Sequence, residues 1–481
     1  MPAPFSFFWH DYETFGRTPR RDRPAQFAGL RTDAELNEID APVMLHCQPP
    51  TDSLPDPQSC LLTGIVPQHC LAQGVPEHQF AAQIEQQLGR PGTVGVGYNS
   101  IRFDDEVTRF LFWRNLIDPY AREWQNECGR WDLMDTVRCA YALRPDGIQW
   151  PREEGKPSFR LEKLTQANGL QHEAAHDALS DVRATLALAR LVRARVPRLW
   201  DFCLKLRQKS AVQAELVLGR PVLHISGMIP AERGCLAIVW PFAPHPTNKN
   251  EVIVWDLAQD PAQLMALSTP QLRERLFTSR EGLAALGLER LPLKTIHINK
   301  SPVVISQLQT LTPVMAERWG VDRALCDRHA QTAARITGEM AGVWPGVFAR
   351  EGPAETPDVD EDLYGGFVGN EDRRLLQRLR DLPPAQLALQ RPRFADGRLD
   401  ELLLRYRARN FPETLNAEEQ QHWQAHRHAR LHEGVNGHPP LAAWMDRIDQ
   451  LNEVAELQGD ERAQQLLSWL VDWAEQVAPE T

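Results

Sequence analysis

The stretch FSFFWHDYETFG, residues 5–16, joins an apolar and aromatic run to two acids, Asp11 and Glu13, which are one residue apart. The run favours a buried β-strand, because aromatic residues are enriched in strands. Side chains at positions i and i+2 of a strand point the same way, so the two carboxylates converge on one place at the strand's end. There they would repel each other and lose hydration. Arginine partners or exposure would relieve that cost, and so would a divalent cation, which prefers oxygen ligands.

A further acid follows another predicted strand. VGVGYNSIRFDDEVTRF, residues 94–110, predicts a strand that ends near Tyr98, a turn at Asn99 and Ser100, and a helix from about Asp104. An acid in the first turn of a helix is often only a favourable partner of the helix dipole. Asp104 by itself therefore leaves a structural and a functional role open.

A third stretch, AAHDALSDVRATLALARLV at residues 174–192, predicts a helix. His176 lies just before or at its start, and Asp181 lies in its first turns. Asp177 is a candidate N-cap, which would make it a structural acid. Taken alone, His176 could equally be a polar residue at a helix end.

The wider chain has 481 residues, 42% of them hydrophobic and 24% charged, with a net charge of −11. This length predicts roughly two to four domains. No apolar run is long enough for a membrane helix, the N-terminus lacks a basic signal region, and eight scattered cysteines form no C-x-x-C pair. We expect a soluble cytoplasmic protein without a structural zinc site or disulfide framework. The acidic balance argues weakly against a simple polyanion binder.

The pattern of predicted secondary structure changes twice along the chain. Residues 1–195 mix β-like runs with amphipathic helices, which is typical of an α/β domain. Residues 197–350 contain short β-like runs (PVLHISGMI, CLAIVWPFA, EVIVWDL, LKTIHIN) and predict a small β-barrel with helical additions. Residues 350–366, rich in proline, glycine and acids, are interpreted as a linker. Residues 353–481 show helical spacing and predict a helical domain. Within it, LLLRYRARN, residues 402–410, is interpreted as a solvated basic helix face.

The three acidic stretches together resemble the DEDDh exonucleases, which include polymerase proofreading domains. The D-x-E of Asp11 and Glu13, the Asn-to-Asp stretch that ends at Asp104, and the H-x-x-x-x-D from His176 to Asp181 occur in the order of that group. The chemistry fits, because two metal ions that clamp a phosphodiester need about four carboxylates, and a water nucleophile needs a base that titrates near neutrality. We therefore interpret Asp11, Glu13, Asp104 and Asp181 as metal ligands and His176 as the general base.

Longer strings resemble the bacterial exonuclease I family across nearly the whole chain. They are HDYETFG, DRPAQFA, RFDDEVTR, YALRPDGI, PSFRLEKLT, HINKSPV and YRARNFPETL. The resemblance implies a monomer that degrades single-stranded DNA processively from the 3′ end to 5′-mononucleotides, with two magnesium ions or manganese, in DNA repair and recombination. It implies a DnaQ-like (RNase H-like) α/β domain, an SH3-like β-barrel domain and an α-helical C-terminal domain. It also implies binding to the acidic C-terminal tail of single-stranded DNA-binding protein.

Between residues 102 and 144, arginines alternate with aromatic residues, a pattern found where proteins hold single-stranded nucleic acid. A packed helical region whose arginines extend to its surface has the same composition. The resemblance implies that Arg160, with Glu13, binds the substrate near the scissile nucleotide, and that Arg144 binds the partner's tail. Packing in the YALRPDG turn is the alternative for Arg144. Phe202 stands where relatives can have tyrosine, which removes a hydroxyl contact. The resemblance implies further DNA contacts at Arg109, Tyr120, Trp124, Arg138, Lys209, Asn250, Lys294 and Asn299.

Three other functions share some of these features. A DEDDh ribonuclease or a proofreading exonuclease could carry the same acids, but neither accounts for the strings in the later domains. A non-catalytic single-stranded DNA-binding module would not need all five active-site positions. Hydrolysis of labelled single-stranded DNA, with duplex DNA and RNA in parallel, distinguishes these alternatives.

Overall fold

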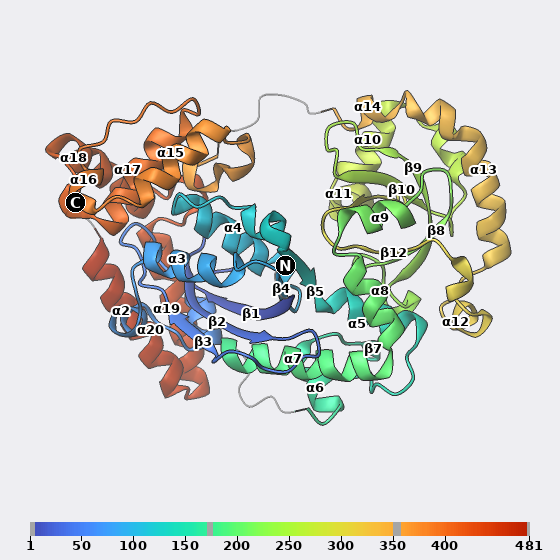
Figure 1. Ribbon diagram of the computed structural model, residues 1–481, viewed down its shortest axis with the longest axis horizontal. Helices are drawn as coiled ribbons and strands as arrows, with labels where there is room; N and C mark the ends of the chain where they lie inside the picture. Colours follow the sequence, from blue (N-terminus) through green and yellow to red (C-terminus); the bar gives the residue numbers. More distant parts are fainter. Residues whose placement is uncertain (1–4, 171–176, 350–356, 479–481) are drawn as a thin grey trace. The chain divides into compact units, whose positions relative to one another are not determined.

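The computed structural model describes residues 5–170, 177–349 and 357–478 (Figure 1). The chain forms two compact units. The first comprises Met1–Gly129, Glu173–Arg183 and Ala354–Thr481, and the second comprises Arg130–His172 and Ala184–Pro353. Among the described residues, no helix combines the length and the apolar character that crossing a membrane requires.

The first unit is built on a sheet with strand order β3-β2-β1-β4-β5. The central strand β1 pairs with β2 in antiparallel and with β4 in parallel orientation. Nearly every residue of β1 and β2 is buried, including polar residues such as His10 and Arg31. The predicted strands near residues 5–13 and 93–99 are therefore confirmed. The strands are β1 (Ser6–Thr14), β2 (Pro24–Thr32), β3 (Val43–His46), β4 (Thr93–Gly97) and β5 (Gly129–Asp132).

Helices α3 and α4 cover one face of this sheet (Figure 1). Phe8 and Phe27 from the strands pack with Phe80 of α3 and Leu111 of α4 in one buried apolar cluster. This packing holds α4 against the sheet, so that its first residues lie close to the end of β1. The helices in the N-terminal part of the unit are α1 (Pro57–Thr63), α2 (Pro67–Gln73), α3 (Glu77–Leu88) and α4 (Asp104–Arg114).

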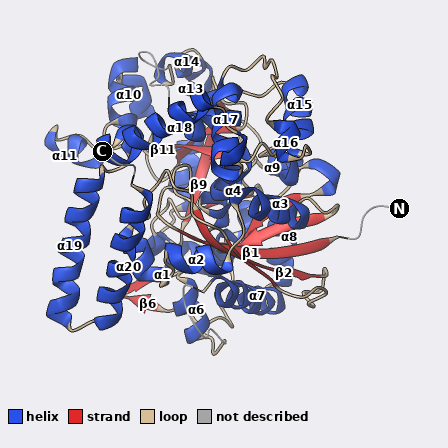
Figure 2. Cartoon of the chain, turned by 90° about the vertical axis from the view of Figure 1, so that its left-hand side faces the viewer, coloured by secondary structure: helices blue, strands red, loops and turns tan. Residues whose placement is uncertain are grey.

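The C-terminal helices share apolar cores with the N-terminal part of the same unit. Trp113 of α4 packs with Leu376 and Leu402, and Phe15 packs with Trp444 and Leu470. The long helices α19 and α20 run side by side (Figure 2). The helices are α15 (Asn370–Arg380), α16 (Pro384–Leu387), α17 (Arg398–Asn410), α18 (Ala417–His428), α19 (Leu441–Gln458) and α20 (Glu461–Val477).

One expectation about this segment is wrong, and a second is wrong for the residues that the structure describes. The arginines of residues 402–410 do not form a solvated face, because Arg405, Arg407 and Arg409 are buried in ion pairs with carboxylates. The described part of the expected linker is packed as well, since Asp360 is 1% exposed and pairs with Arg409. Each group tolerates burial because the other neutralises it.

The second unit contains a small antiparallel sheet of order β11-β10-β9-β8-β12. Val222, Val239, Val254 and Ile296 from four of its strands meet in one buried core. The β-like runs predicted from the sequence are confirmed. The strands are β8 (Val222–Ile225), β9 (Leu236–Pro244), β10 (Glu251–Asp256), β11 (Leu293–His297) and β12 (Val303–Ile305), and a short hairpin is formed by β6 (Arg152–Glu153) and β7 (Lys156–Pro157).

Helices make up most of the rest of the second unit. They are α5 (Leu133–Leu143), α6 (Leu161–Ala167), most of α7 (Ala178–Arg195), α8 (Pro197–Lys205), α9 (Lys209–Glu215), α10 (Thr269–Phe277), α11 (Arg280–Ala285), α12 (Pro313–Arg318), α13 (Arg323–Ala341) and α14 (Trp344–Val347). The first residues of α7, as far as Arg183, belong to the first unit.

Candidate active site

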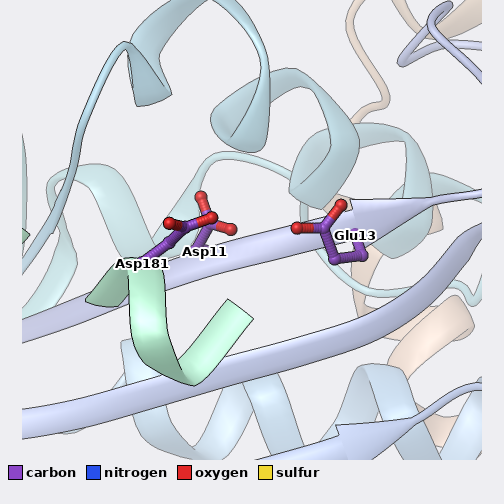
Figure 3. A group of neighbouring side chains, drawn as sticks. All are labelled: Asp11, Glu13 and Asp181. Atoms are coloured by element: carbon purple, nitrogen blue, oxygen red, sulfur yellow. The ribbon is translucent and has the colours of Figure 1, made fainter. Parts of the chain in front are cut away.

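Three acids from two distant stretches converge at β1. Asp11 and Glu13 project from the same side of the strand, and Asp181 comes from the first turns of α7 (Figure 3). Each offers one carboxylate oxygen, and these oxygens all lie within 4.8 Å of one another. Glu13 is only 9% exposed, and Asp11 and Asp181 are partly buried. The expected convergence of the D-x-E pair with Asp181 is therefore present in the structure.

The turn after β4 brings a fourth acid to the same strand. Because β4 runs parallel to β1, the chain leaves β4 beside the acidic end of β1. A Cβ on Gly97 would come within 3.0 Å of the His10 carbonyl oxygen and closer still to Ser100, so glycine permits this tight exit. Asn99 then adopts a left-handed conformation with φ of 63°, which asparagine tolerates better than most residues. Helix α4 begins at Asp104.

Asp104 is held against β1 by a backbone hydrogen bond. The Tyr12 N–H, between the two acids of the strand, donates to Asp104 Oδ1 at 3.1 Å. The Thr108 hydroxyl, one turn along α4, donates to the Tyr12 hydroxyl at 3.0 Å. Asp104 is 3% exposed and lies beside the cluster of three acids rather than within the group whose oxygens are all within 4.8 Å. Its orientation is thus fixed by the same strand that carries Asp11 and Glu13.

The start of α7 confirms the expected role of Asp177. Its Oδ2 accepts a hydrogen bond from the Ser180 N–H at 3.1 Å, which is the bond that an N-cap makes to the third helical residue. Its carbonyl oxygen accepts from the Asp181 N–H at 3.0 Å. Asp181 is thereby set one turn into the helix. His176, the predicted base, lies outside the described residues.

The carboxylates of the site are so close together that ionising all of them costs free energy. Burial, followed by the negative charges of Asp104, Glu13 and Asp181, raises the pKa of Asp11 well above its usual range. Burial and the neighbouring Asp181 likewise raise the pKa of Glu13 to about 8. Among the described residues, burial and neighbouring acids, and no arginine or lysine, account for both shifts. Within the part of the chain that the structure describes, pairing with arginine, which could have explained the D-x-E, does not balance these acids.

The donor set fits a divalent cation. Oxygen ligands stand about 2.0–2.6 Å from Mg²⁺ or Ca²⁺, so oxygens on opposite sides of one ion are roughly 4–5 Å apart. The 4.8 Å limit of the Asp11, Glu13 and Asp181 oxygens matches this spacing. A bound cation would also offset the repulsion that raises the pKa values of Asp11 and Glu13.

The predicted DNA contacts in the first unit have different surroundings. The guanidinium of Arg109 is buried and pairs with Glu123 at 2.7 Å and Glu106 at 2.6 Å. It also lies over the Tyr120 ring, 5.4 Å from the ring centroid. Trp124, by contrast, is 64% exposed. The exposed indole is free to stack on a base, whereas Arg109 is engaged within the protein.

In the second unit, four predicted DNA-contact residues bond to neighbouring protein groups. Arg138 donates to Asp135 at 2.7 Å, Lys209 donates to the Asn250 side chain at 2.7 Å, and Lys294 donates to the Met228 carbonyl at 2.9 Å. Two more predicted residues differ from them. Asn299 Oδ1 is buried without a hydrogen-bond partner within the described residues, and Arg160 is exposed, 3.7 Å from Glu153.

Arg144 lines a pocket of about 760 Å³ in the second unit. Arg195 and Arg198 add positive charge to the lining, Asp146 and Glu215 add negative charge, and Phe202 and Ile305 add apolar surface. The Arg144 guanidinium is exposed but donates to the carbonyl oxygens of Leu143 at 2.5 Å and Thr310 at 3.2 Å. Part of its bonding capacity therefore goes to the turn, as the alternative interpretation expected, while the residue still faces the pocket.

The strand β1 and the helices α4 and α7 bring acids together at one end of β1. This arrangement in an α/β domain is typical of metal-dependent nucleases of the exonuclease class. Residues 8–189 match the family model described as Exonuclease, residues 207–350 the Exonuclease I SH3-like domain, and residues 357–477 the Exonuclease I C-terminal domain. The chain belongs to the exonuclease I family and is an exodeoxyribonuclease. The predicted fold, with an α/β exonuclease domain, an SH3-like domain and a helical C-terminal domain, is confirmed.

Individual relatives agree with this assignment. The chain is 43% identical to Exodeoxyribonuclease I of Escherichia coli over 476 residues, which cover 98% of each chain. Among solved structures, Exonuclease I from Methylocaldum szegediense matches with a TM-score of 0.92 and 47% identity over 99% of this chain and all of that one. E. coli Exonuclease I in complex with a dA16 oligonucleotide matches with a TM-score of 0.91 and 42% identity over 98% of this chain and all of that one.

Proposed function

We propose that this chain hydrolyses single-stranded DNA from the 3′ end, processively and as a monomer, and releases 5′-mononucleotides during DNA repair and recombination. The observation that carries the proposal is the meeting of Asp11 and Glu13 with Asp181 at one end of β1. E. coli Exonuclease I, the 42% identical relative, has been crystallised with oligonucleotides. The domain boundaries at residues 1–195, 197–350 and 353–481 belong to the same proposal.

Asp11, Glu13 and Asp181 would hold the cations, which we propose to be two magnesium ions, with manganese as a substitute. A zinc-bound form of the E. coli enzyme with single-stranded DNA supports divalent metal binding in the family. Bound cations stabilise the negative charge that develops on the phosphate and lower the pKa of a water nucleophile. The Tyr12 N–H keeps Asp104 aimed at the same place, so that this fourth acid can complete the ligand set.

His176 is assigned as the base that accepts the proton of the attacking water. An imidazole titrates near neutrality, which suits proton transfer at physiological pH. This role rests on the H-x-x-x-x-D spacing to Asp181. The N-cap at Asp177 supports it, because the cap places the start of the helix at Ala178, two residues after His176 in the sequence.

The DNA strand would contact exposed aromatic and basic side chains. Trp124 offers a stacking surface, and Arg160 offers an exposed cation near the predicted scissile nucleotide. Arg109 would act by shaping the segment that carries Tyr120, since its guanidinium is already engaged with Glu106 and Glu123. Arg138, Lys209, Asn250, Lys294 and Asn299 remain part of the proposal as the contacts of the second unit.

We assign the pocket that Arg144 lines to the acidic tail of single-stranded DNA-binding protein. The three arginines outnumber the two acids of the lining, Asp146 and Glu215, and would attract a flexible acidic peptide, while the apolar lining would accept its non-polar side chains. A structure described as SSB/Exonuclease I of a relative 41% identical to this chain supports the pairing.

The direct test uses one single-stranded DNA oligonucleotide labelled either at its 3′ or at its 5′ end. With magnesium and DNA in excess over the protein, the 3′ label should appear at once in mononucleotides, while the 5′-labelled strand should pass from full length to short end products with few intermediate lengths, as processive hydrolysis requires. Duplex DNA and single-stranded RNA serve as parallel substrates. Preferred degradation of RNA would favour a ribonuclease, and binding without hydrolysis in the presence of metal would favour a non-catalytic module.

A further inference from the structure

Gln26 stands in the middle of a row of three side chains across the sheet of the first unit. It lies opposite Glu13 of β1 on one side and opposite His46 of β3 on the other. Residues directly opposite each other on neighbouring strands point to the same face, so Gln26 shares the face of the acids. It is only 5% exposed. It lies in the DRPAQFA string, none of whose residues has a role in the proposed reaction. A buried amide in this place needs partners.

Both ends of the Gln26 amide have a partner. Oε1 accepts from the Ala178 N–H at 3.3 Å, and Nε2 lies 3.3 Å from His46 Nε2. A backbone N–H can only donate, so the carbonyl end must face Ala178 and the NH₂ end must face His46. His46 is then a neutral acceptor at Nε2. In agreement, burial and then the nearby His69 lower the pKa of His46, against the opposing effect of Asp177.

The bond to Ala178 joins the strand to the helix that carries Asp181. The first N–H groups of a helix have no partner within the helix. Asp177 satisfies the Ser180 N–H from within the local chain, whereas the Ala178 N–H is satisfied from β2. Gln26 therefore links the first turn of α7 to the strand next to Glu13. This link spans 152 residues of sequence and bears directly on the distance between Asp181 and the acids of β1.

We propose that Gln26 is a positioning residue for the metal site, which sets the place of Asp181 relative to Asp11 and Glu13. The inference rests on the proposed metal-dependent function. Replacing a residue that orients metal ligands without binding the metal itself typically changes metal affinity by about 10–100-fold. Gln26 is only 5% exposed and is neither a proposed metal ligand nor a proposed DNA contact, so its effect should fall on metal binding and turnover and leave KM for DNA unchanged.

Gln26→Met tests the proposal, because methionine keeps the length of the side chain and removes both hydrogen bonds. Gln48→Met is the matched control, since Gln48 also fastens a helix end with its amide, at the Gly74 carbonyl after α2, away from the acids. Gln26→Glu is the second variant, because it retains an acceptor for the Ala178 N–H. The readouts are calorimetric binding of Mn²⁺ to the metal-free protein, kcat and KM on single-stranded DNA, hydrogen exchange over residues 178–183, and urea unfolding.

In Gln26→Met we expect Mn²⁺ affinity to fall by about 10–100-fold, with a comparable loss of kcat, an unchanged KM and faster exchange at the start of α7. Gln48→Met should match the wild type in all of these, and Gln26→Glu should keep the slow exchange. Wild-type Mn²⁺ affinity and kcat in folded Gln26→Met would overturn the inference, and so would loss of the fold itself, which would make Gln26 a stability residue. A wild-type protein that neither binds Mn²⁺ nor hydrolyses DNA would instead refute the proposed function.

Discussion

Arg409 Nη2 donates to Asp52 Oδ2 at 2.7 Å, although the two residues are 357 positions apart in the sequence. The same guanidinium donates through Nη1 to Asp360 at 3.0 Å, and Arg430 donates to Asp52 at 2.9 Å. Asp52 is completely buried, and Asp360 nearly so. This buried ion network joins the segment after β3 to the C-terminal helices within the first unit.

Breaking the network from one side should destabilise the protein strongly. Asp52→Asn leaves Arg409 and Arg430 buried with one carboxylate fewer, and removal of one partner from a buried ion pair typically costs about 3–5 kcal/mol. We expect the free energy of unfolding in urea to fall by that order. Asp446→Asn, at an exposed position of α19, is the control and should change little. A loss no greater than that of the control would mean that the network adds no net stability.

The network should also make the protein sensitive to acid. Burial alone would raise the pKa of Asp52, but Arg409, the hydrogen bond with His426 and Arg430 outweigh burial and hold that pKa well below its usual range. Burial opposes Arg409, Arg405 and Arg23 at Asp360 with the same net result. Because the folded pKa values lie below the unfolded value of about 3.9, this stabilisation is complete above that pH and is lost as pH falls towards the folded values.

Urea unfolding of the wild type and Asp52→Asn at a series of pH values measures this contribution. The difference in unfolding free energy between the two proteins should be constant from neutral pH to about pH 5 and should shrink below about pH 4. A difference that grows as the pH falls would contradict the assigned direction of the pKa shifts.

Loss of Asp181 should abolish hydrolysis while leaving DNA binding intact. Asp181→Ala removes one oxygen from the cluster of acids at β1, and we expect turnover to fall on the order of a thousandfold or more. Asp177→Ala is the matched variant one turn away and should cost far less, because Asp177 acts as a helix cap. Mononucleotide release and DNA binding without metal are measured for both. Near-normal turnover of Asp181→Ala in magnesium would refute the metal assignment.

Trp124 should contribute to DNA affinity by stacking. The side chain is 64% exposed in the first unit, and loss of one base–aromatic stack costs about 1–3 kcal/mol. Trp124→Ala should therefore weaken binding to single-stranded DNA and leave urea unfolding unchanged. Trp469→Ala, at a partly exposed indole on α20, controls for the general loss of an aromatic surface. Equal DNA affinities for the two variants would remove Trp124 from the DNA path.

Arg144 should matter for the acidic partner and not for naked DNA. Arg144→Ala removes one of three arginines that line the pocket, so a labelled acidic tail peptide should bind more weakly. Binding should fall steeply with salt, because exposed charges are screened over about 8–10 Å at physiological ionic strength. Arg220→Ala, at an exposed arginine outside the pocket, is the control. Reduced hydrolysis of naked DNA by Arg144→Ala would show a structural or DNA-binding role instead.

Much of the site could be predicted from the sequence because its signals are local. The two-residue repeat of a strand places Asp11 and Glu13 on one side of β1 whatever surrounds the strand. A capping residue marks the start of a helix, so Asp177 located α7, and with it Asp181, to within a residue or two. The turn at Asn99, between the end of β4 and α4, was also predicted from the local sequence.

Only the tertiary structure decided which charged residues lose their water. The arginines of α17 were predicted to form a solvated face, because long charged side chains normally stay hydrated, yet the side chains of Arg405 and Arg409 are buried. Their burial depends on Asp52 and Asp360, and no local pattern connects residues so far apart. The hydrogen bonds of Gln26 and of the Tyr12 N–H could not be predicted from local sequence either, since their partners Ala178 and Asp104 come from other parts of the chain. The sequence by itself determined which residues could carry the chemistry, and the packing of distant segments determined which groups hold them in place.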